Sequence, residues 1–68
     1  MKIFQQRLKQ ERKTLGLTQR DFAEKLGITQ PSYIRYENGS SQPTLETLVR
    51  IAEILDVSVD YLLGRKDF

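Results

Sequence analysis

The stretch "LTQRDFAEKLGITQPSYIRYENG", residues 17–39, decides the fold of this 68-residue chain. It holds two short runs with apolar residues at helical spacing, separated by only three residues. A threonine that can cap a helix precedes each run, and Gly27 can adopt the left-handed conformation that ends the first. We therefore expect helices at 19–26 and 30–38, joined by a turn so short that they meet steeply, as in a helix-turn-helix motif.

Pro31 lies inside the second of these expected helices. With Thr29 as the cap, the proline falls in the first turn, where backbone N–H groups have no intrahelical acceptor. A missing donor costs little there, so Pro31 supports a helix start at this point and does not argue against a helix.

Apolar residues recur at helical spacing on both sides of this stretch, and Thr44 and Ser58 can cap two further helices. We expect helices from residue 2 or 3 to 15, over 45–55 and over 59–63. The residues expected to face inward are Phe4, Leu8 and Leu15 in the first of these, and Leu45, Leu48, Val49, Ala52 and Leu55, widened by Ile51 and Ile54, in the second. No segment alternates at period two. The sequence therefore predicts an all-α, compact bundle of five short helices, with residues 1–68 as a single domain and the helix-turn-helix core at 19–38.

The charges are distributed unevenly along the chain. Residues 1–35 carry eight basic and three acidic side chains, whereas residues 36–68 carry three basic and six acidic ones. Such asymmetry is consistent with a face that binds a polyanion, although solvated helix surfaces explain it equally well.

Composition argues against several classes of function. The chain has no cysteine and no histidine, which argues against a disulfide, a zinc site of the usual kind, and a catalytic triad with a histidine base. We find no glycine-rich phosphate loop and no paired carboxylates, so we expect no enzyme, no metal, no cofactor and no small-molecule ligand. No apolar run approaches the ~20 residues needed to span a membrane, and no signal peptide is evident, so we expect a cytoplasmic protein.

Taken together with "PTLETLVRIAEILDVSVDYLLG" (residues 43–64), the opening stretch closely resembles the phage-repressor/Cro-type helix-turn-helix family, also called XRE. The resemblance covers residues 8–64. It implies sequence-specific binding to double-stranded DNA, and we expect a transcriptional regulator that acts as a repressor at a near-palindromic operator. Members usually bind as homodimers, with the helix at 30–38 in the major groove.

The resemblance places the base-reading residues at the start of that helix. We expect base contacts from Gln30, Ser32 and Arg35, with Thr29 at the edge. Glutamine can pair with adenine through two hydrogen bonds, and arginine with guanine. In the plain alternatives, Gln30 is solvated, Arg35 binds a phosphate, and Thr29 and Ser32 only cap the helix.

Phosphate contacts are expected on both sides of the reading helix. The start of the preceding helix would provide Gln19 and Arg20, and the end of the reading helix with its loop would provide Asn38, Gly39, Ser40 and Ser41. The alternative is an ordinary first turn at one side and a simple cap and loop at the other.

The remaining expectations concern structural roles. The resemblance implies an ion pair between Arg12 and Glu37 that holds the end of the reading helix. Tyr33 and Tyr36 occupy positions that the family fills with apolar residues, so we expect both rings in the core with each hydroxyl at the surface. Ile34 departs from the family pattern, and its role stays open.

A small dimer patch is expected near the end of the chain, at Val57, Val59, Tyr61 and Leu62, unless these residues serve only the core. The rival function is a protein-interaction module, such as an antitoxin, built on the same fold. Such a module should expose apolar anchors on the helix at 30–38, where only Ile34 qualifies.

Overall fold

A computed structural model describes residues 2–68. This part of the chain forms five helices and no strand: α1 (Lys2–Thr14), α2 (Gln19–Leu26), α3 (Gln30–Asn38), α4 (Leu45–Leu55) and α5 (Val59–Leu62). The predicted all-α class and the number and order of the helices are confirmed. No helix within these residues is both long and apolar enough to cross a membrane.

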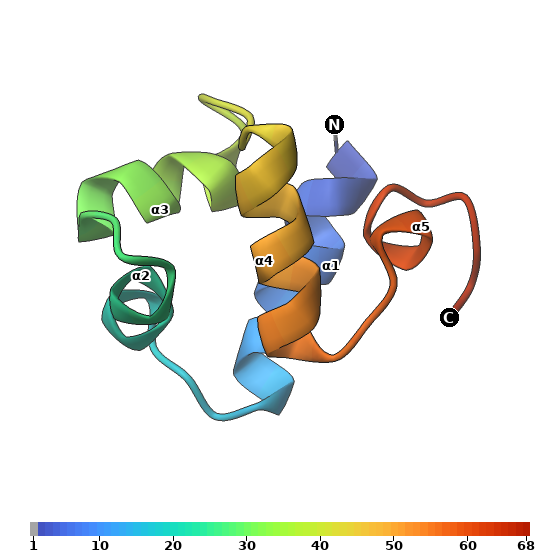
Figure 1. The fold of residues 1–68 in the computed structure, drawn as a ribbon, viewed down its shortest axis with the longest axis horizontal. Helices are drawn as coiled ribbons and strands as arrows, with labels where there is room; N and C mark the ends of the chain where they lie inside the picture. The colour runs from blue at the N-terminus through green and yellow to red at the C-terminus, as the bar shows by residue number, and fades with distance from the viewer. Residues whose placement is uncertain (1) are drawn as a thin grey trace.

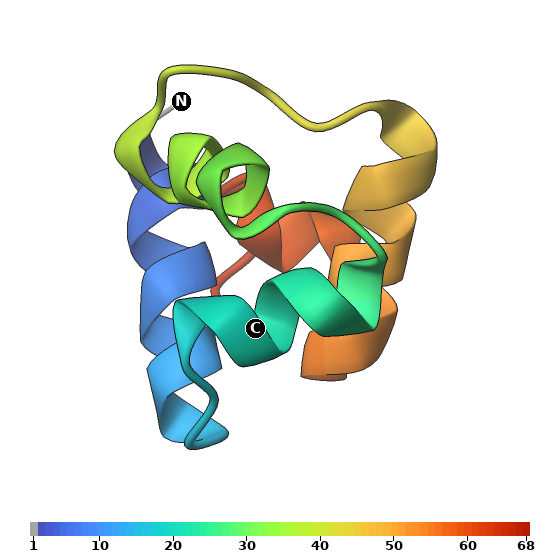
Figure 2. The ribbon, with the colours of Figure 1, turned by 90° about the vertical axis from the view of Figure 1, so that its left-hand side faces the viewer.

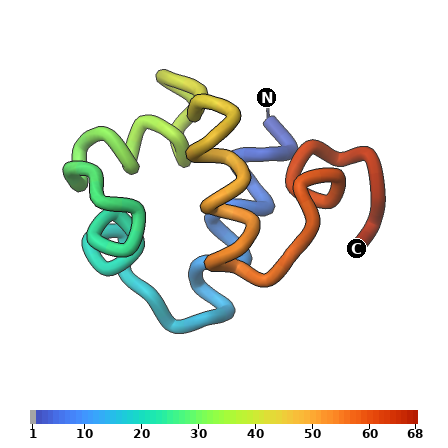
Figure 3. The backbone as a smooth tube through the Cα atoms, viewed as in Figure 1, coloured from blue at the N-terminus to red at the C-terminus, as the bar shows by residue number. Residues whose placement is uncertain are grey.

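The helices enclose one core (Figures 1 and 2). Seen from the side that carries α2 and α3, α1 lies to the left, α4 to the right, and α5 closes the back (Figure 2). Helices α2 and α3 contact each other, and α3 also packs on α1. The backbone trace shows that α3 rises at its end into a loop that crosses to the start of α4, next to the N-terminal end of α1 (Figure 3).

Each of α2 to α5 begins at the predicted cap. The side-chain oxygens of Thr18, Thr29, Thr44 and Ser58 each accept a hydrogen bond from the backbone N–H three residues further on. At α2, Asp21 completes a capping box by accepting from the N–H of Thr18. These bonds satisfy donors that have no partner within the helix, which is why the helix starts could be predicted locally.

The ends of α2 and α3 are fixed by glycines in the left-handed conformation, Gly27 with φ 73° and Gly39 with φ 84°. Helix α4 ends on Asp56, which adopts the same conformation at φ 57° and is the single residue other than glycine in 2–68 with a positive φ. The backbone can therefore reverse direction after α2 within three residues.

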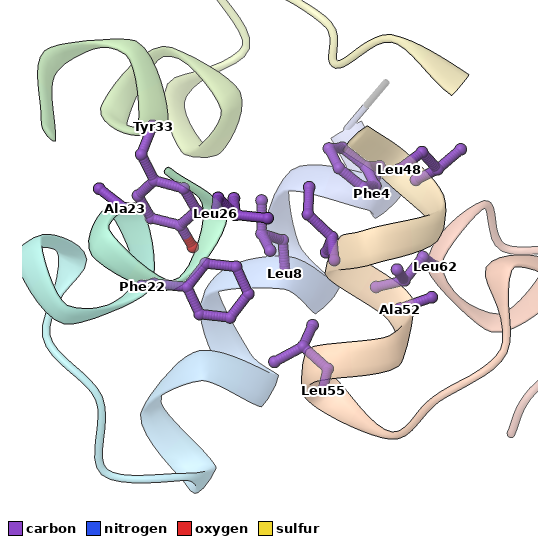
Figure 4. Close-up of a cluster of buried hydrophobic side chains, with 11 residues drawn as sticks. Phe4, Leu8, Phe22, Ala23, Leu26, Tyr33, Leu48, Ala52, Leu55 and Leu62 are labelled. Atoms are coloured by element: carbon purple, nitrogen blue, oxygen red, sulfur yellow. The ribbon is translucent and has the colours of Figure 1, made fainter. Parts of the chain in front are cut away.

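Eleven buried apolar side chains form the core (Figure 4): Phe4, Leu8, Phe22, Ala23, Leu26, Tyr33, Leu48, Ile51, Ala52, Leu55 and Leu62. Every helix contributes at least one of them. The buried stripe of α1 is completed by Arg12, which lies one turn beyond Leu8.

Three residues expected in the core are not there. Leu15 is 49% exposed, because α1 ends at Thr14 and its side chain lies beyond the last turn. Leu45, the first residue of α4, is 81% exposed. Val49 lies on the flank of α4 and is also exposed.

Candidate nucleic-acid interface

Arg12 of α1 and Glu37 of α3 form an ion pair, with 2.6 Å between Arg12 Nε and Glu37 Oε2. Their side chains are only 8% and 4% exposed. Arg12 also donates from Nη2 to Glu37 Oε1 at 3.2 Å and from Nη1 to the carbonyl of Leu17 at 2.7 Å. One guanidinium group thus joins α1, the turn before α2 and the end of α3.

The Glu37 carboxylate accepts four hydrogen bonds in all. Besides the two from Arg12, Gln19 Nε2 donates to Oε1 at 3.2 Å and the hydroxyl of Tyr33 donates to Oε2. Two oxygens offer about four acceptor positions, so the carboxylate is saturated. Burial alone would raise the pKa of Glu37, but the bonds from Arg12, Tyr33 and Gln19 outweigh it and hold the pKa below its ordinary value. Glu37 is therefore ionised and fixed at neutral pH.

Tyr33 lies in the core, as predicted. Its hydroxyl was expected at the surface, but it does not reach the surface. The Tyr33 side chain is fully buried, and the centre of its ring lies 5.0 Å from that of Phe22. Its hydroxyl donates to the carboxylate of Glu37, one turn along α3. Burial and the neighbouring carboxylate both raise the pKa of Tyr33. Tyr36 is half-buried against the core, with its ring edge-on to Tyr33 at 6.4 Å. The polar network thus fixes the inner face of α3.

The outer face of α3 is open. Gln30, Pro31 and Arg35 are exposed, and neither Gln30 nor Arg35 forms an ion pair or a side-chain hydrogen bond within residues 2–68. The hydroxyls at the helix start are engaged with each other: Thr29 Oγ1 donates to Ser32 Oγ at 2.8 Å and accepts from the Ser32 N–H. Thr29 is thus the cap, while Gln30 and Arg35 keep their full capacity for an external partner.

Ile34 is half-buried but lies outside the group of side chains packed against the core. The outer surface of α3 therefore carries no large exposed apolar side chain.

At the start of α2, the two predicted phosphate residues differ. Gln19 is half-buried and donates one amide N–H to Glu37, so its second amide N–H has no acceptor in the described residues. Arg20 is exposed and forms no ion pair in the described part of the chain. Hydrogen bonds from Thr18 lower the pKa of Asp21, which keeps a negative charge beside this turn.

The loop after α3 uses some of its own donors. The N–H of Ser40 donates to Asn38 Oδ1 at 2.9 Å, and the N–H of Ser41 donates to the carbonyl of Arg35 at 3.3 Å. The hydroxyls of both serines are unpaired in residues 2–68. The available donors of this loop are therefore fewer than the sequence suggested.

This geometry agrees with what comparison with known proteins finds. A family model described as helix-turn-helix matches residues 8–62, which is most of the chain. The chain belongs to the XRE-type helix-turn-helix family. The family and the relatives' names are those of DNA-binding transcriptional regulators and not of enzymes.

Three relatives illustrate the similarity. The uncharacterized HTH-type transcriptional regulator YqaE of Bacillus subtilis (strain 168) is 54% identical over 61 residues, covering 90% of this chain and 53% of YqaE. The cryptic phage CTXphi transcriptional repressor RstR of Vibrio cholerae is 46% identical over 65 residues, covering 96% of this chain and 57% of RstR. The uncharacterized HTH-type transcriptional regulator YobD of Bacillus subtilis is 49% identical over 65 residues, covering 96% and 58%. The chain thus spans about half the length of the curated relatives it matches.

The prediction that Leu62 belongs to a dimer patch is wrong, because Leu62 is fully buried in the core of its own chain. Val57, Val59 and Tyr61 are half-buried and remain partly at the surface. The Arg7 guanidinium lies 4.3 Å from the centre of the Tyr61 ring. The Tyr61 hydroxyl donates to Glu11 at 2.9 Å, so α1 holds this patch in place, and that bond raises the pKa of Tyr61.

Three contacts in this arrangement were not foreseen from the sequence. Tyr33 and Glu37 are four apart on one helix, a spacing that places side chains together, and this could have indicated their hydrogen bond. The approach of Gln19 to the same carboxylate, and of Arg7 to Tyr61, joins residues far apart in the chain and left no local signal.

Proposed function

We propose that this domain binds double-stranded DNA sequence-specifically, as the DNA-binding part of a transcriptional repressor, with α3 in the major groove. The observation that carries the proposal is the contrast between the two faces of α3. Its inner face is fixed by Glu37 and Tyr33, while Gln30 and Arg35 on the outer face have no partner within residues 2–68. A rigid helix with unengaged hydrogen-bonding side chains suits base reading.

In this proposal Gln30 pairs with adenine and Arg35 with guanine, each through two hydrogen bonds. Thr29 and Ser32 lie at the edge of the groove, where their hydroxyls can exchange their mutual bond for one to DNA. Pro31 can offer only an apolar contact.

Phosphates on one side of the groove would meet Arg20 and the second amide N–H of Gln19. Those on the other side would meet Gly39 and the hydroxyls of Ser40 and Ser41. Such contacts position the protein and make its affinity strongly dependent on salt.

The domain acts on its operator as a homodimer, through Val57, Val59 and Tyr61. These three side chains lie around α5 and are partly exposed. A two-fold arrangement would place the same surface of both copies in contact and the two α3 helices one turn of DNA apart, ~34 Å. The operator is then near-palindromic. That RstR is named a transcriptional repressor supports repression as the outcome.

Selection from random duplex DNA with the purified chain tests the proposal. At moderate salt, the enriched sequences should share a motif with two-fold symmetry and two half-sites about one helical turn apart. If no motif is enriched, the proposal fails, and a protein-interaction module becomes the better reading of the fold.

A further inference from the structure

The side chain of Gln5, in the second turn of α1, lies against the glycine that ends α3. A Cβ atom placed on Gly39 would lie 2.2 Å from Gln5 Nε2 and 2.8 Å from Gln5 Cδ. Only a residue without a side chain leaves room for this amide, and the left-handed backbone of Gly39 (φ 84°) also favours glycine. The amide group of Gln5 and the backbone of Gly39 are therefore immediate neighbours.

The donors gathered at this point have no acceptor in the described part of the chain. The Gln5 amide forms no hydrogen bond there. The hydroxyls of Ser40 and Ser41, which follow Gly39 directly, have no partner either. A polar surface that keeps several adjacent donors unpaired is ready for an acceptor from outside.

The charges around this group favour an anion. The first turn of α1 has no acidic residue, and Lys2 is exposed there. The carboxylate nearest in sequence, that of Glu37, is buried and fully occupied by its four donors. The N-terminal end of α1, the end of α3 and the following loop lie at one end of the molecule in both ribbon views (Figures 1 and 2).

We propose that Gln5 is a DNA-contacting residue, and that its amide binds one backbone phosphate beside Gly39. Phosphate oxygens accept from side-chain amides and backbone N–H groups, and such contacts fix the register of a protein on the duplex. This clamp holds the end of α3 while Gln30 reads bases at its start. The inference rests on the proposed function, which assigns DNA to this face but leaves α1 without a DNA contact.

Gln6 provides a matched control. It is the same residue type on the same turn of α1, but it is exposed and lies on the outer face of that helix beside Lys9 and Lys13. Substitutions at Gln5 and Gln6 alter helix propensity and composition equally, so a difference between them reports the position of the side chain.

The experiment measures the dissociation constant for a selected operator at fixed salt, with the thermal midpoint of each variant alongside. Gln5→Ala should bind about tenfold more weakly, equivalent to ~1.4 kcal/mol, with a thermal midpoint close to that of the unsubstituted chain. Gln5→Glu, which keeps the shape but places a negative charge beside the phosphate, should bind more weakly still. Gln6→Ala and Gln6→Glu should each retain more of the affinity than the matching Gln5 variant. The base preferences selected by Gln5→Ala should be unchanged, because a phosphate contact carries no sequence information.

A scan with single methylphosphonates identifies the contact itself. Neutralising one phosphate in each half-site should weaken the unsubstituted chain clearly more than it weakens Gln5→Ala. If no such position exists, or if Gln5→Ala binds as tightly as the unsubstituted chain, Gln5 is not a DNA contact. A loss of affinity that follows only a lowered thermal midpoint assigns Gln5 to packing and overturns the inference. If the unsubstituted chain itself binds no duplex, the proposed function fails and the inference with it.

Discussion

Replacing Arg12 by methionine removes the guanidinium but keeps an apolar stem of similar length. Glu37 then loses two of its four donors while its side chain remains almost wholly buried, at 4% exposure. Breaking a buried ion pair from one side costs about 3–5 kcal/mol, because a charge is left without compensation. A chain of this size has a free energy of unfolding of about 3–10 kcal/mol. Arg12→Met should therefore lose a third or more of its stability.

The assay is urea unfolding at pH 7, which gives the free energy of unfolding, with thermal unfolding beside it. A loss of about 3 kcal/mol should lower the thermal midpoint by at least about 12 °C in a domain this small. Arg50→Met is the control: Arg50 is exposed and donates to the carbonyls of Lys25 and Leu26 at 3.1 Å, so its loss should cost about 1–2 kcal/mol, less than the loss of Arg12.

A double variant separates the cost of leaving Glu37 unpaired from the net contribution of the ion pair to stability. Arg12→Met with Glu37→Met removes both charges and should recover much of the stability lost in Arg12→Met, because no buried charge is left unpaired. The reasoning is refuted if Arg12→Met costs less than about 1 kcal/mol, or if the double variant is no more stable than Arg12→Met.

Three further predictions concern the fold. Leu8→Ala should cost about 2–5 kcal/mol in urea unfolding and Leu15→Ala no more than about 0.5, because the first side chain is buried and the second is exposed; similar costs would contradict the packing described. The pKa of Glu37 is lowered from its ordinary 4.5, so its carboxylate contributes stability above about pH 4.5 that is lost as the pH falls through the folded-state pKa. Between pH 7 and pH 3, the thermal midpoint of the unsubstituted chain should therefore fall more steeply than that of Glu37→Gln. Parallel profiles for the two proteins would exclude this linkage. Asp56→Gly should raise the free energy of unfolding by about 0.5–1 kcal/mol, because Asp56 occupies the left-handed region, and a lower thermal midpoint would show that its side chain is required.

The positions of the helices could be predicted because their signals are local. Thr29 caps α3 with its own side chain, and Gly27 ends α2 with its own backbone, so neither depends on the rest of the fold. The fate of the terminal apolar residues could not be predicted in this way. Leu15 and Leu45 have the spacing of inward residues, but which turn of a helix is covered depends on where neighbouring helices end.

In the candidate site, too, some features could be predicted from local sequence and others could not. The exposure of Gln30 and Arg35 follows from their place on α3 relative to its buried residues, and helical spacing alone indicates it. The convergence of Arg12, Gln19 and Tyr33 on one carboxylate joins three helices, and only the packed chain shows it. Because this network saturates Glu37, the inner face of α3 is fixed before any partner arrives, a point that the sequence could only suggest through resemblance.

The most direct test of the claim that the outer face of α3 reads DNA is to repeat the duplex selection with Gln30→Ala. Gln30 forms no side-chain hydrogen bond or ion pair in residues 2–68, so its removal should leave the thermal midpoint nearly unchanged. The selected motif should lose its preference at one position in each half-site, by about 1–3 kcal/mol in discrimination, and keep its other positions. A selected motif identical to that of the unsubstituted chain would contradict the assignment of Gln30 as a base-reading residue.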